Sequence, residues 1–253
     1  MQAGLWRRVV AECVGTAMLV LVGAGSVVAA LRVGGGEVGY ASLGFISLAF
    51  AIIVAVVIYG FGPVSGAHIN PAVTLALAAT RRFPWAEVLP YVVAQLVGAF
   101  VGAVLIIAVF GSGAVDLGLG ATSLGEGVPY WQGIVAESLG TFLLLFAVMA
   151  LAVDSRAPLG WAGLMIGLAV AAAILLIAPQ TGGSLNPART FGPYLALALF
   201  GGEVPWGQFL LYWVGPLLGA VVAAVLYDLV AETRRAQAPA AEESYTPNPP
   251  EEA

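Results

Sequence analysis

Two short polar segments carry the residues in this chain that are best suited to chemistry. They are residues 66–74, Gly-Ala-His-Ile-Asn-Pro-Ala-Val-Thr, and residues 182–190, Gly-Gly-Ser-Leu-Asn-Pro-Ala-Arg-Thr. Asn is a good helix N-cap, and Pro suits the first helical position, where its missing N–H would be unpaired in any case. We therefore predict that each segment is a loop that runs into the N-terminus of a helix.

Both predicted helices are short. The apolar runs 72–80 and 188–200 would extend roughly 15–20 Å, about half of a ~30 Å hydrocarbon core. Two such half-helices that meet at their N-termini would make up one membrane span. A capping Asn uses its side-chain oxygen, so we expect the amide groups of Asn70 and Asn186 to stay free as donors. Beside two positive helix ends, these amides would hold a passing water by its oxygen.

The residues next to each Asn have structural parts in this prediction. Pro71 and Pro187 start the half-helices, and the small side chains of Ala72 and Ala188 allow the half-helices to touch. Asn70 and Asn186 could also be plain caps with no part in a pore.

The composition excludes a water-soluble domain. Hydrophobic residues make up 60% of the chain, charged residues make up 9%, and the mean hydropathy is +0.98. Apolar runs long enough to span a bilayer occur at about 9–31, 41–61, 86–110, 131–153, 159–178 and 206–230. We predict an all-α membrane protein with six transmembrane helices and two re-entrant half-helices.

Arginine placement indicates the orientation, because the chain has no lysine. If six spans alternate, one side of the membrane receives Arg7, Arg8, Arg81, Arg82, Arg156, Arg234 and Arg235. Only Arg32 falls on the other side, and Arg189 lies in the second re-entrant loop. By the positive-inside rule, both termini are cytoplasmic in a multi-pass protein of the cell (plasma or inner) membrane.

The chain contains two copies of a sequence repeat. Residues 11–16, Ala-Glu-Cys-Val-Gly-Thr, match residues 136–141, Ala-Glu-Ser-Leu-Gly-Thr. We place one repeat at about 6–110 and the other at about 129–231, within a channel domain of residues 1–235. Three spans in each repeat is an odd number, so the second repeat must insert upside down, and sites then form at the midplane between the halves. The tail, residues 236–253, is rich in Pro, Glu and Ala, and we expect it to be disordered and cytoplasmic.

The duplicated Asn-Pro-Ala, the Arg after its second copy and the apolar chain around them resemble the aquaporin (major intrinsic protein) family, and most of all archaeal-type aquaporins. The resemblance covers roughly residues 6–231. It implies a passive, bidirectional channel that catalyses no reaction and forms a homotetramer in the lipid bilayer. No cofactor, metal or nucleic acid is implied.

The resemblance also implies a narrow selectivity filter near the outer mouth, formed by Phe50, Ile174, Gly183 and Arg189. Strict water channels typically have His where this chain has Ile174. Glycerol facilitators typically have Asp after the Arg, where this chain has Thr190. Losing the His removes a donor and its bulk, so we expect an aperture that is wider and more apolar than that of a water-only filter.

Four polar residues at membrane depth need separate interpretations. Arg189 opposes the helix dipole and is costly in a membrane, so it either lines an aqueous path or is an interfacial anchor. Glu12 and Glu137 occupy equivalent positions in the repeats and are either a proton relay or braces that accept hydrogen bonds from the re-entrant loops; the resemblance favours braces. His68 is either a loop brace or a pH gate.

We therefore predict a passive channel for water, and for small neutral solutes such as glycerol or dissolved gases, that excludes protons and ions. One alternative is a channel mainly for glycerol-type solutes. A second is an ion-coupled secondary transporter, since inverted repeats and broken helices serve those too. A structural membrane protein that conducts nothing would leave Arg189 without a purpose.

Overall fold

The computed structural model describes residues 3–231, and every regular element in this range is a helix. The predicted tail, residues 236–253, lies outside the described residues. In chain order the helices are α1 (Leu5–Leu19), α2 (Gly25–Val33), α3 (Tyr40–Ser65), α4 (Pro71–Ala79), α5 (Trp85–Phe110), α6 (Gly113–Asp116), α7 (Tyr130–Val148), α8 (Ala162–Thr181), α9 (Pro187–Phe200) and α10 (Leu211–Ala231).

Within residues 3–231, six helical segments are long and apolar enough to span a bilayer. They are Leu5–Val33, Tyr40–Ser65, Trp85–Phe110, Tyr130–Val153, Ala162–Thr181 and Trp206–Ala231. The shorter helices α4 and α9 follow the two Asn-Pro loops. The predicted fold class is therefore confirmed. Two of the spans contain π-helical turns that the sequence did not predict, at Val20–Ala24 and Met149–Val153.

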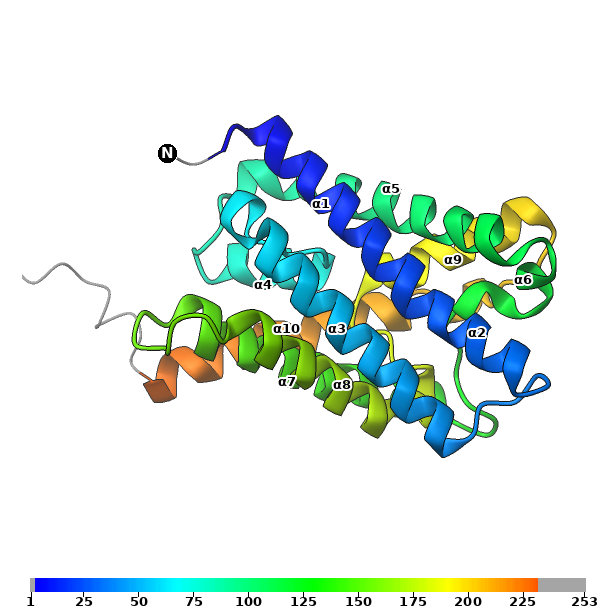
Figure 1. The fold of residues 1–253 in the computed structure, drawn as a ribbon. Coiled ribbons are helices and arrows are strands. Elements are labelled where there is room, and N and C mark those ends of the chain that lie inside the picture. Colours follow the sequence, from blue (N-terminus) through cyan, green and yellow to red (C-terminus); the bar gives the residue numbers. More distant parts are fainter. Residues whose placement is uncertain (1–2, 232–253) are drawn as a thin grey trace, which may run out of the picture.

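The two halves of the chain interlock. Helix α1 packs on α5 in the first half, α7 packs on α10 in the second, and α3 packs on α8 between them. Each half-helix packs against a long helix of the other half, α4 on α10 and α9 on α5. Figure 1 shows α4 and α9 between the long helices, at opposite ends of the bundle. This arrangement directs the two half-helix N-termini toward the middle of the molecule.

Glycines at equivalent places in the two halves allow the closest helix contacts. A Cβ at Gly98 of α5 would collide with the backbone of Cys13 in α1, and a Cβ at Gly219 of α10 would collide with the backbone of Ser138 in α7. Small residues of this kind are how membrane helices approach each other without a hydrophobic driving force. Equivalent glycines in the two repeats therefore allow the same close pair of helices in each half.

The connector between the halves contains more structure than its Gly-rich composition suggests. Residues 111–128 join the two repeats and contain α6 and a 3₁₀ turn at Gly118–Gly120. Leu119 in this turn is fully buried and has a left-handed backbone, with φ 49°. Gly118 and Gly120 have positive φ as well, so the chain folds inward here instead of crossing the surface.

Contacts between distant segments hold the start of α1 and the end of α10. The Arg8 guanidinium near the start of α1 donates to Glu87 at the start of α5 with two hydrogen bonds of 2.6 Å. At the same end, Nη2 of Arg156 donates to the carbonyl of Ala231, the last residue of α10 (2.9 Å). The start of α1 and the end of α10 therefore lie on the same side of the molecule (Figure 1).

Candidate pore

Both Asn-Pro segments cap a half-helix as the sequence predicts. The Asn70 side-chain oxygen accepts a hydrogen bond from the Ala72 N–H (2.9 Å), and α4 begins at Pro71. In the second copy, the Asn186 oxygen accepts from the N–H groups of Ala188 (2.9 Å) and Arg189 (3.3 Å). Both Asn residues have extended backbones, with φ near −155° in each case: −156° for Asn70 and −153° for Asn186. The two caps are thus near copies of one another.

The amide nitrogens of these Asn residues tie the two loops together. Nδ2 of Asn70 donates to the carbonyl of Leu185 (2.8 Å), and Nδ2 of Asn186 donates to the carbonyl of Ile69 (2.8 Å). We had expected these amides to be wholly free. Each NH₂ has two N–H donors, however, so one binds the opposite loop and one is left. Both Asn residues line the central cavity.

The loops hold strained backbone conformations that present those carbonyls. Ile69 and Leu185 have φ values of 43° and 56°, in the left-handed region that costs a non-Gly residue about 1–2 kcal/mol. The preceding helices α3 and α8 each end at a Gly with positive φ, Gly66 (87°) and Gly182 (76°). Something outside the loops must therefore hold them in place.

Glu137 and Glu12 each form hydrogen bonds with the backbone of one of these loops. Glu137 is fully buried, and its carboxylate accepts hydrogen bonds from the backbone N–H groups of Ser184 (2.9 Å) and Leu185 (2.7 Å). Glu12, also fully buried, accepts from the N–H groups of His68 (2.9 Å) and Ile69 (2.6 Å). Both carboxylates direct their oxygens at loop N–H groups, and this arrangement supports the brace interpretation over the proton relay.

Further braces were missed in the sequence, although the repeat contains a signal for them. The Tyr91 hydroxyl donates to the carbonyl of Ser65 (2.9 Å), and the Tyr212 hydroxyl donates to the carbonyl of Thr181 (2.8 Å). Each Tyr lies seven residues before the equivalent packing glycines of α5 and α10. Aligning the halves on those glycines would have paired the two tyrosines.

The carboxylate shells also include side chains that were not predicted. Ser65 Oγ donates to Glu12 and Thr181 Oγ1 donates to Glu137, each at 2.7 Å. Gln95 adds a bond to Glu12 (2.8 Å). Each shell therefore combines backbone and side-chain donors.

His68 is held mainly by its ring contacts. Its Nδ1 lies 3.1 Å from Thr74 Oγ1, and its ring packs against Phe83 and Tyr91, with centroid distances of 4.8 and 5.3 Å. The residue also lines the central cavity. Its packing supports a loop-bracing role.

Arg189, a predicted filter residue, lies buried beside Phe50. Its side chain is only 2% exposed, and Nη1 donates to the carbonyl of Gly120 (2.7 Å) in the connector between the halves. Its Cζ lies 5.3 Å from the centre of the Phe50 ring, a cation–π distance. Buried Nε of Arg189 has no protein acceptor within residues 3–231. Its guanidinium thus keeps donor capacity for a passing molecule.

Two cavities meet at the predicted filter. The central cavity, of about 330 Å³, runs past both Asn residues, and the second cavity has a volume of about 360 Å³. Phe50, Ile174 and Arg189 line both cavities and so mark the place where they join. Gly183 lines neither cavity, whereas its neighbour Gly182 lines the second. That Gly183 itself faces the aperture stays a prediction.

Gly23 makes room for the aromatic wall of this junction. It lies in the π-helical turn Val20–Ala24, and a Cβ built on it would collide with the Phe50 ring. The sequence alone contains no sign of this contact, because it depends on the unpredicted π turn.

Comparison with known proteins finds relatives of this chain in sequence and in structure. The family model described as "Major intrinsic protein" matches residues 1–227. The chain is 48% identical over 242 residues to "Probable aquaporin AqpM" of Archaeoglobus fulgidus, covering 90% of this chain and 98% of that protein. It is 45% identical over 238 residues to "Aquaporin AqpM" of Methanothermobacter marburgensis, covering 88% and 97%. The solved aquaglyceroporin of Plasmodium falciparum shares the fold, with a TM-score of 0.78 and 23% identity over 90% of this chain and 97% of that one.

Proposed function

We propose a permeation mechanism for this chain, which belongs to the major intrinsic protein family and is a passive transmembrane channel for water and small solutes. One observation carries the mechanism. The central cavity is lined by Arg189, by both capping Asn residues and by apolar side chains, so a molecule moving along it meets a few fixed donors between apolar walls. The family consists of channels, and we propose that this member catalyses no reaction.

Water moves in single file past these donors. The remaining N–H of Asn70 and of Asn186 holds a water molecule by its oxygen at the meeting point of two positive helix ends. Protons and cations are excluded because those helix ends and Arg189 repel them, as holds for aquaporin-type pores in general. The mechanism needs no cofactor and no metal.

The filter decides which solutes accompany water. The junction pairs the positive charge of Arg189 with the apolar side chains of Phe50 and Ile174. Ile174 offers no hydrogen bond. A molecule with apolar groups therefore enters the filter at a lower free-energy cost than it would beside a His. We propose that small neutral solutes, glycerol and dissolved gases among them, pass together with water. A channel mainly for glycerol-type solutes is the alternative that Ile174 favours.

An ion-coupled transporter fits the site less well. It would need carboxylates that are open to the path, but Glu12 and Glu137 are directed at loop N–H groups. Neither carboxylate lines the central cavity. The braces are therefore better explained as parts of a static pore.

The channel is embedded in the cell membrane as a homotetramer with both termini in the cytoplasm. The family suggests the tetramer, and the arginines near the chain ends suggest the orientation. Native mass spectrometry of the detergent-solubilised protein tests the subunit number. Protease access to a tag on either terminus in sealed right-side-out vesicles tests the orientation.

Stopped-flow light scattering of proteoliposomes tests the channel itself. A sucrose gradient measures water flux and a glycerol gradient measures glycerol flux. We expect fast water flux with an activation energy close to that of water self-diffusion, together with measurable glycerol flux. Planar bilayers that hold the same protein should carry no ion current. A proton or sodium conductance would overturn the mechanism, and solute uptake that follows an ion gradient would favour the transporter.

A further inference from the structure

A second arginine lines the central cavity, at the end opposite the filter. We call this end the inner mouth; it is formed by Ile58, Leu77, Arg82, Ala152 and Val153. Within residues 3–231, Arg82 and Arg189 are the only arginines among the lining residues, and no Asp or Glu is among them. The proposed mechanism assigns Arg189 to the filter and leaves Arg82 without a function.

The end of α4 places Arg82 at the inner mouth. The chain reverses after Thr80 through Arg81, whose φ is 64°, with bonds from Arg81 N–H to Ala78 O (3.0 Å) and from Arg82 N–H to Leu77 O (2.8 Å). This pair of bonds is a Schellman closure, which normally uses Gly where this chain has Arg81. Nη1 of Arg82 also reaches the carbonyl of Thr80 (3.3 Å), so the cation covers the negative helix end.

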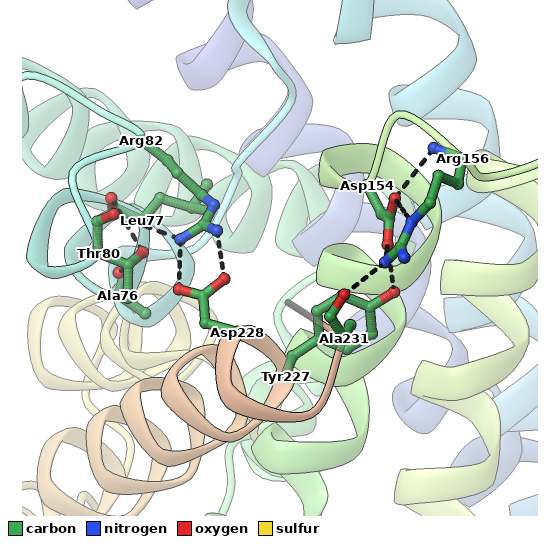
Figure 2. Close-up of polar contacts among 9 residues, drawn as sticks. All are labelled: Ala76, Leu77, Thr80, Arg82, Asp154, Arg156, Tyr227, Asp228 and Ala231. Atoms are coloured by element: carbon green, nitrogen blue, oxygen red, sulfur yellow. Dashed lines mark hydrogen bonds and ion pairs between the residues drawn. The ribbon is translucent and has the colours of Figure 1, made fainter. Parts of the chain in front are cut away.

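Asp228 in the last turns of α10 holds the other side of the guanidinium. Its Oδ2 accepts from Nη1 of Arg82 (3.0 Å), and its Oδ1 accepts from Nη2. The exposed fractions of the two side chains are small, 11% for Arg82 and 8% for Asp228. Figure 2 shows this two-pronged pair joining the end of α4 to α10. The fork geometry fixes the plane of the guanidinium as well as its position.

A second ionic contact holds the same part of α10 but contains no lining arginine. Asp154 pairs with Arg156 (2.6 Å) and accepts a hydrogen bond from the Tyr227 hydroxyl (2.9 Å), and Arg156 reaches the carbonyl of Ala231 (Figure 2). The Arg156 side chain is 55% exposed and does not line the cavity. This contact can stabilise the end of α10 without affecting the charge at the inner mouth.

We propose that Asp228 is a positioning residue that keeps the Arg82 guanidinium flat against the wall of the inner mouth, so that the mouth stays open and electrically neutral. The inference rests on the channel function. Without the carboxylate, the almost buried guanidinium loses a charged partner, which makes its buried position less favourable and favours a turn toward a more polar environment. In the proposed channel, permeating water passes Arg82, because this residue lines the central cavity. Turned into that water, the guanidinium would obstruct the single file with its volume and its charge.

The experiment is a double-mutant cycle read as water permeability per reconstituted channel. Asp228→Asn should lower water flux several-fold, because Arg82 is retained but has lost the two-pronged bond to a carboxylate. Arg82→Gln should stay close to the wild type, since no cation is released. The double variant should recover to the level of Arg82→Gln. A purely structural loss would not be rescued by removing the second partner, so the recovery separates positioning from folding.

Glu87→Gln is the matched control. It breaks an equally bidentate arginine pair at the same end of the molecule, but the arginine it releases, Arg8, does not line the cavity. Its water flux should match the wild type. If Asp228→Asn is not recovered in folded form, Arg82→Lys serves instead: the cation remains, the two-pronged geometry is lost, and reduced flux is expected.

Three results would overturn the proposal: unchanged flux in Asp228→Asn or in its substitute Arg82→Lys, a double variant as slow as Asp228→Asn, or an equal loss in Glu87→Gln. Wild-type flux measured in the same vesicles tests the channel function separately. A wild-type channel that conducts water while the cycle fails would reject only the role of Asp228.

Discussion

Replacing Glu137 tests whether the buried carboxylates are braces, and the structure sets the expected size of the effect. The carboxylate accepts from two backbone N–H groups, those of Ser184 and Leu185, and from the Thr181 hydroxyl. Glu137→Leu leaves both N–H groups buried and unpaired, at about 1–3 kcal/mol each, or roughly 2–6 kcal/mol together. Glu137→Gln retains one oxygen, so one N–H then faces an NH₂ and the cost falls to about 1–3 kcal/mol.

The assay compares thermal unfolding in detergent with water flux in proteoliposomes. We expect the unfolding midpoint to fall in the order wild type, Gln variant, Leu variant, with partial flux kept by the Gln variant. Glu126→Gln, at an exposed loop carboxylate, should change neither quantity. A Gln variant that is as stable as the wild type but conducts no water would refute the brace, because only a protonation role would then explain the loss.

Three further predictions follow from single contacts. Ile174→His should narrow the filter and add a donor, lowering the ratio of glycerol to water permeability; an unchanged ratio would place the filter elsewhere. Gly23→Val should push the Phe50 ring into the aperture and reduce water flux in folded protein, because even a Cβ at this position collides with that ring. The Arg156 guanidinium holds the pKa of Asp154 below its usual range, so the pair stabilises the fold at neutral pH and loses this effect as acid titrates the lowered pKa. Asp154→Asn should therefore lower the unfolding midpoint at neutral pH and flatten its acid-side decline.

The fold was largely predictable because its signals are local and occur twice. Span lengths follow from hydropathy, and the half-helix starts follow from the Asn-Pro pairs at Asn70 and Asn186. The π-helical turns were not predictable, because a one-residue change of helical register leaves the apolar composition of a span unchanged. The inward fold at Leu119 was hidden for a related reason: Gly-rich composition indicates turns but not their direction.

The site was predictable as a set of residues but only partly as a set of contacts. The acceptor of Arg189 is the carbonyl of Gly120, in a connector that lies outside both repeats. The arginine pattern predicts the side of the membrane on which Arg82 lies, but its partner Asp228 is far along the chain with no motif to mark it. Such pairs depend on how the two halves dock, and a single sequence contains no direct signal of that docking.

The contacts between the loops make each half of the pore depend on the other. Glu137 holds the Leu185 N–H, and the carbonyl of Leu185 accepts the amide of Asn70 from the opposite half. Glu12 holds Ile69, whose carbonyl accepts the amide of Asn186 in the same way. A carboxylate in one repeat thus orients the capping Asn of the other, and the direction of each remaining N–H is set across the pseudo-two-fold axis. Because the two links are equivalent, damage to either brace should disorient the donor that belongs to the intact repeat.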